Sequence, residues 1–508
     1  MRNPLAARSL EPTTGEHPVD SNIIEEKIGL SKIGTIFASG AALFSDGYAN
    51  ASIGPVLHII RTYIYPDSFK SGSQNASLVS SMAFAGIIIG QLSFGWISDK
   101  IGRKFGMLAC TFIVFLFSAL EAASKGPGPQ GTINALILLT ISAYRFFVGI
   151  GIGGEYPTGS VAASSLINER LFNKRHQQRL FVLATNTMID FAFVLSYFVC
   201  LVLLWIFGMN HLNAVWRMTL GLGVIPPMFL LYFRLKMSEP ESYKANSMKH
   251  TRIPYWLLIK RYWVKLLAVS ITWFLYGTYV VSFGLYSTAI TSVAVPNATL
   301  YETIGWGCLI NFFYIPGTVI GAFVVDWLGP KYCMIFGLVM QAIFGFFLSG
   351  FYHHLVPNHV AGFAIMYGIF LSFGELGPGN CLGLLASKAI GPTAARGQLY
   401  GIAAAVGKVG AFIGTYTFDD IIASFGGEDS YGSNTGVFWL ASGLAVASAI
   451  ITFVFIPNIR SDFMHDEDIK FREYLIEHGY DVSKMGADPL SDVNQLEAAA
   501  IRADGEKL

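Results

Sequence analysis

Residues 90–104 read GQLSFGWISDKIGRK, and residues 317–331 read GTVIGAFVVDWLGPK. Both stretches run from an apolar segment into a basic end. Gly, Asp, Gly and Lys recur in them at one offset of 227 positions, which pairs Asp99 with Asp326. Two parallel repeats of this kind are typical of secondary transporters, whose substrate site lies between the repeats. The pattern therefore predicts a duplicated membrane protein with one central site.

A second echo supports the duplication. Gly154-Glu155-Tyr-Pro in the first half resembles Gly374-Glu375-Leu-Gly-Pro in the second half. Each places an acid beside glycine and proline inside an apolar run, where interrupted helices can bind ions at membrane depth. Both glutamates are therefore candidate site residues.

The composition excludes a soluble protein. Of 508 residues, 53% are apolar and 13% are charged, and the mean hydropathy is +0.51. Soluble domains carry about 25% charged residues. A net charge of +1 argues against a nucleic-acid partner. The cysteines lie inside apolar runs without C-x-x-C spacing, so we expect neither a disulfide framework nor a metal site, and no cofactor.

Twelve apolar runs are long enough to cross a bilayer as helices, which takes about 20 residues each. We expect an all-α membrane protein with two pseudo-symmetric bundles of six helices. The twelve runs are residues 34–59, 77–98, 105–123, 133–157, 180–207, 214–234, 265–292, 304–326, 332–352, 360–386, 398–420 and 434–456. The predicted division is a tail at 1–33, bundles at 34–234 and 265–456, a linker at 235–264, and an acidic tail at 457–508 that forms short solvated helices or is disordered.

Basic residues place both termini in the cytosol, because loops rich in Lys and Arg stay on that side of the membrane. In this orientation the inner loops hold eighteen Lys and Arg residues, Arg234 among them, and the outer loops hold four. Two N-x-[ST] sequons, at Asn75 and Asn297, fall in predicted outer loops and are candidate glycosylation sites.

The run Gly95-x-x-x-Asp99-Lys-x-Gly102-Arg103-Lys104 resembles the signature of the major facilitator superfamily between helices 2 and 3. The resemblance implies the major facilitator fold with its twelve helices. It also implies a gating latch, in which an aspartate and basic residues hold helix ends together in one state of the gate. The candidate latch residues are Asp99, Arg103, Lys104 and Asp326.

Two further stretches resemble the phosphate:proton symporter family. Residues 145–157, RFFVGIGIGGEYP, resemble its helix 4, and residues 405–411, AVGKVGA, resemble the helix 11 segment with its phosphate-binding lysine. Within that family, residues 38–50 (ASGAALFSDGYAN) and residues 377–380 (GPGN) resemble the fungal glycerophosphodiester permeases. The resemblance runs from about residue 30 to 487 and implies import of glycerophosphoinositol or glycerophosphocholine.

One position departs from the family. The family commonly has a carboxylate two residues after Trp-Phe-Leu, and here Gly277 stands two residues after Leu275. We therefore expect that a proton carrier on helix 7 is absent or has moved. The missing side chain also favours a ligand larger than phosphate.

Charged residues inside the predicted spans each cost about 2.5–3.5 kcal/mol on insertion scales, so each needs a reason. They are Asp46, Arg145, Glu155, Asp190, Glu375 and Lys408. The four acids are candidate proton carriers, because burial favours the neutral form of a carboxyl. Lys408 is the candidate anion ligand, with glycines at 407 and 410 leaving room for the anion. Arg145 is either a second phosphate ligand or the structural partner of an acid.

Aromatic and polar side chains complete the expected substrate site. Trp273, Tyr276 and Tyr279 share one face of helix 7, where they either pack in the core or form a cage for a head group. Such a cage would hold choline by cation–π attraction. Tyr156 and Asn380, which lie in the family-like stretches, are further candidate ligands.

We expect a proton-coupled secondary transporter of the plasma membrane, a monomer among lipids, that imports a glycerophosphodiester by alternating access. An inorganic phosphate:proton symporter and a non-transporting nutrient sensor are the alternatives. An enzyme or ATP-driven pump is not expected, because Gly407-Lys408-Val409 lacks the other residues of a Walker loop. The sequence does not decide between choline and inositol, although Asp190 and the helix 7 aromatic residues slightly favour choline.

Overall fold

The structure is a computed structural model, and it describes residues 30–66, 75–125, 134–167, 176–236, 243, 247–248, 252–285, 298–355, 360–426, 431–459, 463–482 and 485. Within these ranges every regular element is a helix. Eleven stretches of them are long and apolar enough to cross a membrane. Helices α1 (Leu30–Ala51) and α2 (Ile53–Ile59) lie where the first span was predicted. The predicted all-α membrane fold is confirmed.

The first half forms six helical segments, several of which are chains of shorter helices, and five of them are among the eleven stretches that could cross a membrane. In order these are α1, α2 and η1 (Ile60–Ile64); α3 (Asn75–Lys100); α4 (Arg103–Ala122); α5 (Asn134–Glu155), η4 (Tyr156–Ser160) and α6 (Val161–Ile167); α7 (Gln177–Ala184) and α8 (Asn186–Phe207); and η6 (Met209–His211), α9 (Leu212–Gly221), η7 (Leu222–Val224) and α10 (Ile225–Leu235).

The second half repeats this plan and adds a C-terminal helix. In order its elements are α12 (Tyr255–Leu285); α14 (Leu300–Phe312) and α15 (Tyr314–Leu328); α16 (Pro330–Gly350); α17 (Tyr352–Leu355); α18 (Val360–Gly374), η8 (Glu375–Gly379) and α19 (Asn380–Lys388); η9 (Thr393–Ala395) and α20 (Arg396–Tyr416); α21 (Phe418–Ser424); α22 (Tyr431–Phe455); and α23 (Phe463–Glu477).

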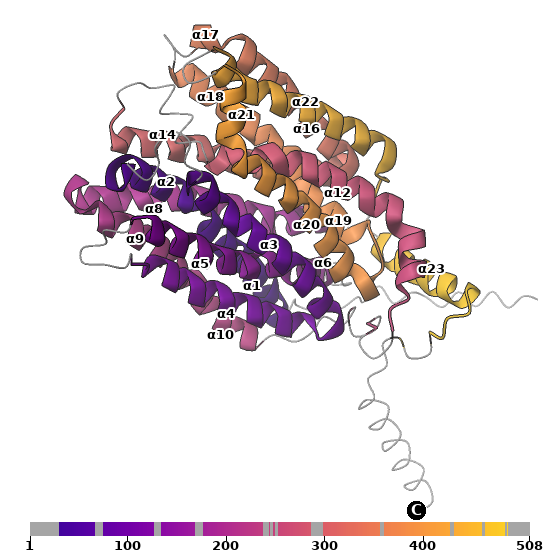
Figure 1. Ribbon diagram of the computed structural model, residues 1–508. Helices are drawn as coiled ribbons and strands as arrows, with labels where there is room; N and C mark the ends of the chain where they lie inside the picture. Colours follow the sequence, from indigo (N-terminus) through magenta and orange to yellow (C-terminus); the bar gives the residue numbers. More distant parts are fainter. Residues whose placement is uncertain are drawn as a thin grey trace, which may run out of the picture.

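The two halves form two bundles that lie side by side. In Figure 1 the indigo to magenta helices α1 to α10 gather in the lower part of the molecule, and the pink to orange helices α12 to α22 gather above them and to the right. The bundles meet where α3 packs along α20 and where α8 packs along α14 and α15. The predicted pair of bundles is therefore present, and its interface is formed by helices 2 and 5 of one half with helices 11 and 8 of the other.

Helix α12 begins earlier than the sequence predicts. It starts at Tyr255, ten residues before the predicted span 265–292, and it is 31 residues long. Part of the predicted linker 235–264 is therefore helical. The basic residues Lys260, Arg261 and Lys265, which fall in or at the edge of the predicted linker, lie in the first three turns of this helix.

The C-terminal tail contains a short helix, α23 (Phe463–Glu477), as one of the two predicted alternatives expects, but this helix is docked on the bundle rather than fully solvated. Phe471 and Leu475 of α23 are buried. Glu467 accepts a hydrogen bond of 2.8 Å from the Tyr262 hydroxyl of α12, and Asp468 accepts one of 2.6 Å from the backbone N–H of Thr393. Helix α23 thus packs against the beginnings of α12 and α20 (Figure 1).

Both acid-glycine-proline motifs form a π-turn inside a span. Glu155 directly precedes η4, which contains Pro157, and Glu375 opens η8, which contains Pro378. Proline lacks an N–H, and its ring clashes with the carbonyl of the preceding turn, so the helix cannot continue regularly. The motif repeated in the sequence therefore forms the same structure in both halves, with an acid at an interruption of the helix.

The two repeated aspartates connect the bundles in equivalent ways. Asp99 accepts hydrogen bonds from the backbone N–H groups of Gly397 and Gln398, at 3.1 and 2.8 Å, where α20 begins. Asp326 accepts one of 3.1 Å from the backbone N–H of Arg179 near the start of α7. Each acid therefore sits at the N-terminus of a helix in the opposite half, where the helix dipole favours negative charge.

The basic latch residues follow Asp99 at the start of α4. The Arg103 guanidinium is buried and lies 4.8 Å from the ring centroid of Tyr243, whose hydroxyl donates to the Asp99 carbonyl at 3.1 Å. Lys104 is the next residue of the same turn. The motif thus fixes the end of α3 to the chain that leads into the second half.

Candidate functional site

A cavity of about 140 Å³ lies between the bundles, with room for several water molecules or part of a small solute. Both halves contribute to its walls. It brings together most of the site residues singled out from the sequence, namely Asp46, Tyr156, Asp190, Trp273, Tyr276, Glu375, Asn380 and Lys408. Arg145, Glu155 and Tyr279 do not line it.

Lys408 of α20 is the basic residue among the described residues that line this cavity. Its Nζ lies 5.4 Å from the ring centroid of Tyr156 and 5.8 Å from that of Phe84. Within the described ranges no carboxylate lies within 4.0 Å of Nζ, and no hydrogen bond to it is present. Aromatic rings attract a cation without using its N–H donors. Lys408 therefore keeps three donors for an anion in the cavity.

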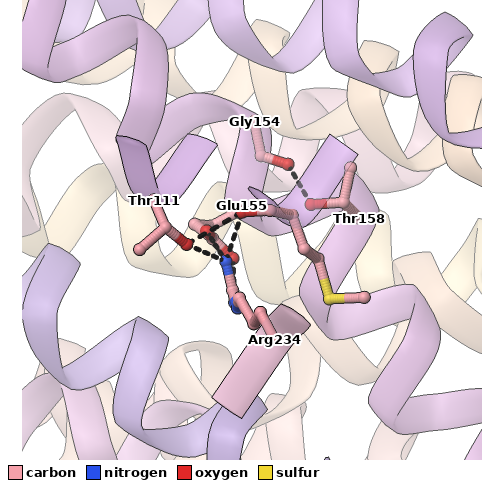
Figure 2. A network of polar contacts seen from close by, with 6 residues as sticks. Thr111, Gly154, Glu155, Thr158 and Arg234 are labelled. Atoms are coloured by element: carbon pink, nitrogen blue, oxygen red, sulfur yellow. Dashed lines mark hydrogen bonds and ion pairs between the residues drawn. The ribbon is translucent and has the colours of Figure 1, made fainter. Parts of the chain in front are cut away.

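Glu155 is not a free acid, because Arg234 of α10 binds it (Figure 2). Both guanidinium Nη atoms contact the carboxylate, with Nη2 2.6 Å from Oε2. Arg234 Nη1 also donates to the Met107 carbonyl at 2.7 Å and to Thr111 Oγ1 at 2.5 Å. All these residues belong to the first bundle. Such a two-pronged pair fixes both charges in one geometry.

The role of Arg234 as the partner of Glu155 was not predicted from the sequence. Arg234 is the second-last residue of α10, at the end of a predicted span, and was counted among the basic loop residues. In the structure it is 1% exposed. The charge balance could have indicated a further buried base. The charges singled out inside the predicted spans are four acids and only two bases, so at least two of these acids lack a basic partner among them.

Arg145 forms a second closed pair, away from the cavity. Its Nη1 lies 3.5 Å from Oε1 of Glu121, and its Nε donates to the Val79 carbonyl at 3.0 Å. Of the two roles considered for Arg145, the structure shows the pairing with an acid, and it does not bring the guanidinium to the cavity. The partner Glu121, near the end of the span predicted at 105–123, was also missed.

Asp46 of α1 lines the cavity and has no ion-pair partner among the described residues. It is 3% exposed, and its Oδ2 has no hydrogen-bond partner. Asn50, one turn later, also lines the cavity with an unpartnered Oδ1. Asp46 can therefore exchange a proton with the cavity without breaking a bond to the protein.

Asp190 of α8 and Glu375 of η8 form an acidic pair across the interface between the bundles. The Asn186 side chain links them, because its Nδ2 lies 2.8 Å from Glu375 Oε2 and 3.4 Å from Asp190 Oδ2. The Tyr276 hydroxyl donates to Glu375 Oε1 at 3.0 Å. In the described part of the chain, only neutral groups donate to this pair, and no base lies within ion-pair distance of it.

The remaining predicted ligands take different positions. Asn380 lines the cavity, but its Oδ1 already accepts from Thr318 Oγ1 at 2.7 Å and its Nδ2 donates to the Thr318 carbonyl at 3.0 Å. Tyr279 does not line the cavity, and its hydroxyl donates to Gln341 Oε1 at 2.8 Å. The Trp273 ring lines the cavity and packs edge-on against Tyr400.

Glycines let α12 and α20 approach closely beside the cavity. A Cβ at Gly277 would lie 2.3 Å from the Gly407 carbonyl oxygen, and a Cβ at Gly410 would lie 2.3 Å from that of Phe274. A Cβ at Gly407 would likewise lie 2.6 Å from the Trp273 ring. The interpretation that these glycines mainly leave room for a ligand is therefore incomplete, because each first permits the helix contact.

The charges in and around the cavity thus fall into two groups. Glu121–Arg145 and Glu155–Arg234 are closed pairs inside the first bundle. Asp46, Asp190, Glu375 and Lys408 are the charges that line the cavity, and none of them has an ion-pair partner within the described ranges. Lys408 can therefore bind an anionic group of a substrate. The carboxylates of Asp46, Asp190 and Glu375 can bind a proton or a cationic group.

Some predicted features lie outside what the structure describes. Asn297 is not among the described residues, and neither is the side chain of Asn75, the first residue of α3. Both glycosylation sites therefore stay predictions. The described residues contain no cluster of side chains suited to hold a metal ion.

Comparison with protein families gives one match in each half. The family described as "Sugar (and other) transporter" matches residues 34–250 and residues 236–466. Together the two matches cover most of the chain. They agree with the duplicated bundles.

Curated relatives from fungi are similar along nearly the whole chain. The sequence is 45% identical to the glycerophosphocholine permease of Candida albicans, over 92% of this chain and 86% of the relative. It is 41% identical to the major glycerophosphoinositol permease of the same organism, over 95% and 88%. It is 34% identical to glycerophosphoinositol transporter 1 of Saccharomyces cerevisiae, over 93% and 88%. The resemblance to the fungal glycerophosphodiester permeases is confirmed.

Among solved structures, the proton:xylose symporter XylE bound to 6-bromo-6-deoxy-D-glucose has a TM-score of 0.71 at 17% identity, over 87% of this chain and 99% of that chain. This likeness establishes the fold. The chain therefore belongs to the family of sugar and other transporters within the major facilitator superfamily, and it is a multi-pass membrane transporter rather than an enzyme.

Proposed function

We propose that this transporter imports a glycerophosphodiester, either glycerophosphocholine or glycerophosphoinositol, together with a proton by alternating access. Relatives of both kinds are more than 40% identical to the chain. The observation that carries the proposal is Lys408, a partly buried cation in the central cavity that forms no ion pair within 4.0 Å with an acid of the described residues. A compact ammonium with three free donors fits the phosphate that both substrates share.

Asp46 is the proposed proton carrier. It lines the cavity with an unpartnered oxygen, whereas Glu155 of the same bundle is held by Arg234 and does not line the cavity. Protonation of Asp46 would remove a negative charge from the cavity and so ease entry of an anionic phosphodiester.

Alternating access would work through the two latches. Asp99 and Asp326 each hold the N-terminus of a helix in the opposite bundle, so rocking of the bundles must release both. We place this transporter in the plasma membrane with both termini in the cytosol, because the basic residues gather on the loops of one side.

Uptake by the purified protein in liposomes tests the proposal. Radiolabelled glycerophosphocholine and glycerophosphoinositol are supplied outside, and uptake should rise as the external pH falls and stop with a protonophore. Uptake of inorganic phosphate but of neither diester would favour the phosphate symporter. Uptake of none of the three would favour the sensor.

Lys408→Ala tests the anion site. Loss of a charge-assisted hydrogen bond to phosphate costs about 1.5–3 kcal/mol, so uptake of both diesters should fall at least about tenfold at equal protein amounts. The matched control is Lys260→Ala, which removes an exposed positive charge from α12 and should leave uptake unchanged. Near-normal uptake by a well-expressed Lys408→Ala variant would refute the assignment.

A further inference from the structure

We propose that Asp190 and Glu375 form a subsite for a cationic head group, so that the cavity selects glycerophosphodiesters carrying an ammonium over those with a neutral head. This inference rests on the proposed function, because it concerns the end of the substrate that Lys408 does not bind. It assigns the acidic pair to the substrate rather than to proton coupling, the role expected from the sequence.

The charge arrangement is the first argument. Asp190 and Glu375 are 4% and 8% exposed, yet both line the cavity. Their hydrogen bonds come from the neutral groups of Asn186 and Tyr276, and no base of the described chain pairs with them. A buried carboxylate is costly unless an opposite charge compensates it. A cationic ligand in the cavity would supply that charge.

The walls beside the pair are the second argument, and they are independent of the acids. Trp273, Tyr276 and Tyr314 line the same cavity, and Tyr276 is bonded directly to Glu375. Aromatic rings around a carboxylate are the chemistry that recognises a quaternary ammonium, through cation–π attraction and charge. An inositol ring offers hydroxyl groups and no charge, so it gains neither term.

The other half of the molecule provides an internal reference. Glu155 stands at the equivalent π-turn, but there Arg234 of the last helix of the bundle neutralises it. The last helix of the second bundle, α22, contains no charged residue at all, and Glu375 receives no such partner. The same motif is therefore internally neutralised in one half and left open to the cavity in the other.

Lys408 makes the cavity bipolar. It contributes the positive charge from α20, while Asp190 and Glu375 contribute negative charge from α8 and η8. A phosphodiester with a cationic head carries the same two charges in one molecule. The complementary arrangement of opposite charges is what gives an interface its specificity.

The decisive experiment needs no mutation. Uptake of labelled glycerophosphocholine into liposomes containing the wild-type protein is competed with unlabelled glycerophosphocholine, glycerophosphoethanolamine, glycerophosphoinositol and glycerophosphoglycerol. All four share the glycerophosphate, so differences in half-inhibitory concentration report the head group. We expect the two cationic compounds to compete at least about tenfold better than the two neutral-headed ones, because only they gain cation–π attraction and charge at this subsite. Equal competition by all four would overturn the inference.

Two variants test the residues themselves. Asp190→Asn and Glu375→Gln should each reduce the preference for cationic over neutral heads to less than about threefold, while glycerophosphoinositol uptake and its pH dependence persist. Glu302→Gln is the matched control, because it neutralises an exposed acid of α14 whose capping role glutamine can keep, and it should leave the preference unchanged. Loss of the pH dependence of glycerophosphoinositol uptake would show that the pair carries the proton and would overturn the inference.

The outcomes separate this inference from the proposed function. A wild-type protein that carries no diester contradicts the proposed function as a whole. A protein that carries the diesters without regard to head-group charge contradicts the head-group subsite alone. The competition series decides between these results even where a variant fails to fold.

Discussion

Glu155 and Glu375 stand at the start of matching π-helical turns in the two halves, but the charges around them differ. Glu155 is held by Arg234 inside the first bundle and does not line the cavity. Glu375 lines the cavity, and neutral donors from Asn186 and Tyr276 are its partners. The two halves therefore hold equivalent acids whose surroundings differ by one arginine on the last helix of the first bundle.

The difference teaches how a transporter can build an asymmetric site from a symmetric scaffold. Within a membrane bundle a charge must be paired or must face a cavity. The paired acid holds its bundle together. The unpaired acid is left available for a ligand, together with Asp190. The comparison therefore predicts that equivalent substitutions in the two halves have different effects.

The largest expected effect is breaking the closed pair. Arg234→Met leaves Glu155 buried without its base and should destabilise the protein by about 3–5 kcal/mol, because removal of one partner strands the other charge. Thermal unfolding of the purified protein in detergent measures this loss. Arg261→Met is the control, because Arg261 pairs with Glu467 at a site 27% exposed and should cost no more than about 1 kcal/mol. An Arg234→Met protein as stable as the wild type would mean that the pair is not what stabilises the first bundle.

The same acid-to-amide change in the two halves tests the comparison directly. Glu155→Gln leaves the Arg234 guanidinium without a counter-charge and should cost about 3 kcal/mol or more of stability. Glu375→Gln strands no base and keeps groups that can bond Tyr276 and Asn186, so it should cost less than about 1 kcal/mol. Unfolding midpoints of the two variants, measured side by side, give the difference. Equal losses would show that the halves are energetically alike and would remove the internal reference for the head-group subsite.

Charge movement sharpens the assignment of the acids. If Asp46 alone carries a proton, glycerophosphocholine import moves one net positive charge inward, and glycerophosphoinositol import is neutral. One charge crossing 100 mV is worth about 2.3 kcal/mol, so only the choline compound should be driven by the membrane potential. Currents recorded on a solid-supported membrane with proteoliposomes measure this. A clear inward current with glycerophosphoinositol would mean a second proton, and Glu375 or Asp190 would be its first candidate carrier.

The smallest expected effect concerns the latches, where the two halves remain equivalent. Asp99→Ala and Asp326→Ala each remove a side chain that accepts from backbone N–H groups at a helix start, and each should cost about 0.5–2 kcal/mol. Asn at either position can still cap a helix and serves as the conservative control. Unfolding midpoints again provide the measurement, and a difference above about 3 kcal/mol between the two alanine variants would contradict the equivalence.

The sequence predicted the candidate cavity well but its ligand geometry only in part. Asp46, Asp190, Glu375 and Lys408 were all identified as costly charges inside apolar runs, and all four line the cavity. Arg145 was identified by the same argument, yet it lies beside Glu121 outside the cavity. The free-energy cost of a charge in a membrane span indicates that the charge has a structural or functional role. It does not distinguish a residue that binds a ligand from one that pairs with another charge.

Gly277 illustrates a second limit. The sequence showed that a side chain is missing from helix 7, and the structure places Gly277 at the cavity. Its Cβ position, however, is blocked by the Gly407 carbonyl oxygen at 2.3 Å. Gly277→Asp would therefore disturb the contact between α12 and α20 before it tested substrate size. A close approach of two backbones is a property of helix packing that a single sequence position does not reveal.

The sequence by itself determined the spans, the duplication and the latch aspartates, because each depends on local chemistry. A run of about 20 apolar residues must cross the membrane as a helix wherever it stands in the chain, since its backbone groups can be satisfied only within the helix. A motif repeated at a fixed offset likewise needs no knowledge of the fold.

Only the tertiary structure decided which charges are partners. Arg234 reaches Glu155 across 79 positions of sequence, and Asp468 reaches Thr393 across 75 positions to dock a tail helix predicted to be solvated. Electrostatic energy depends on the distance between charges in space and on their burial, and neither follows from their separation along the chain. The assignment of Lys408, Asp190 and Glu375 to the cavity therefore became possible only when the two bundles were seen together.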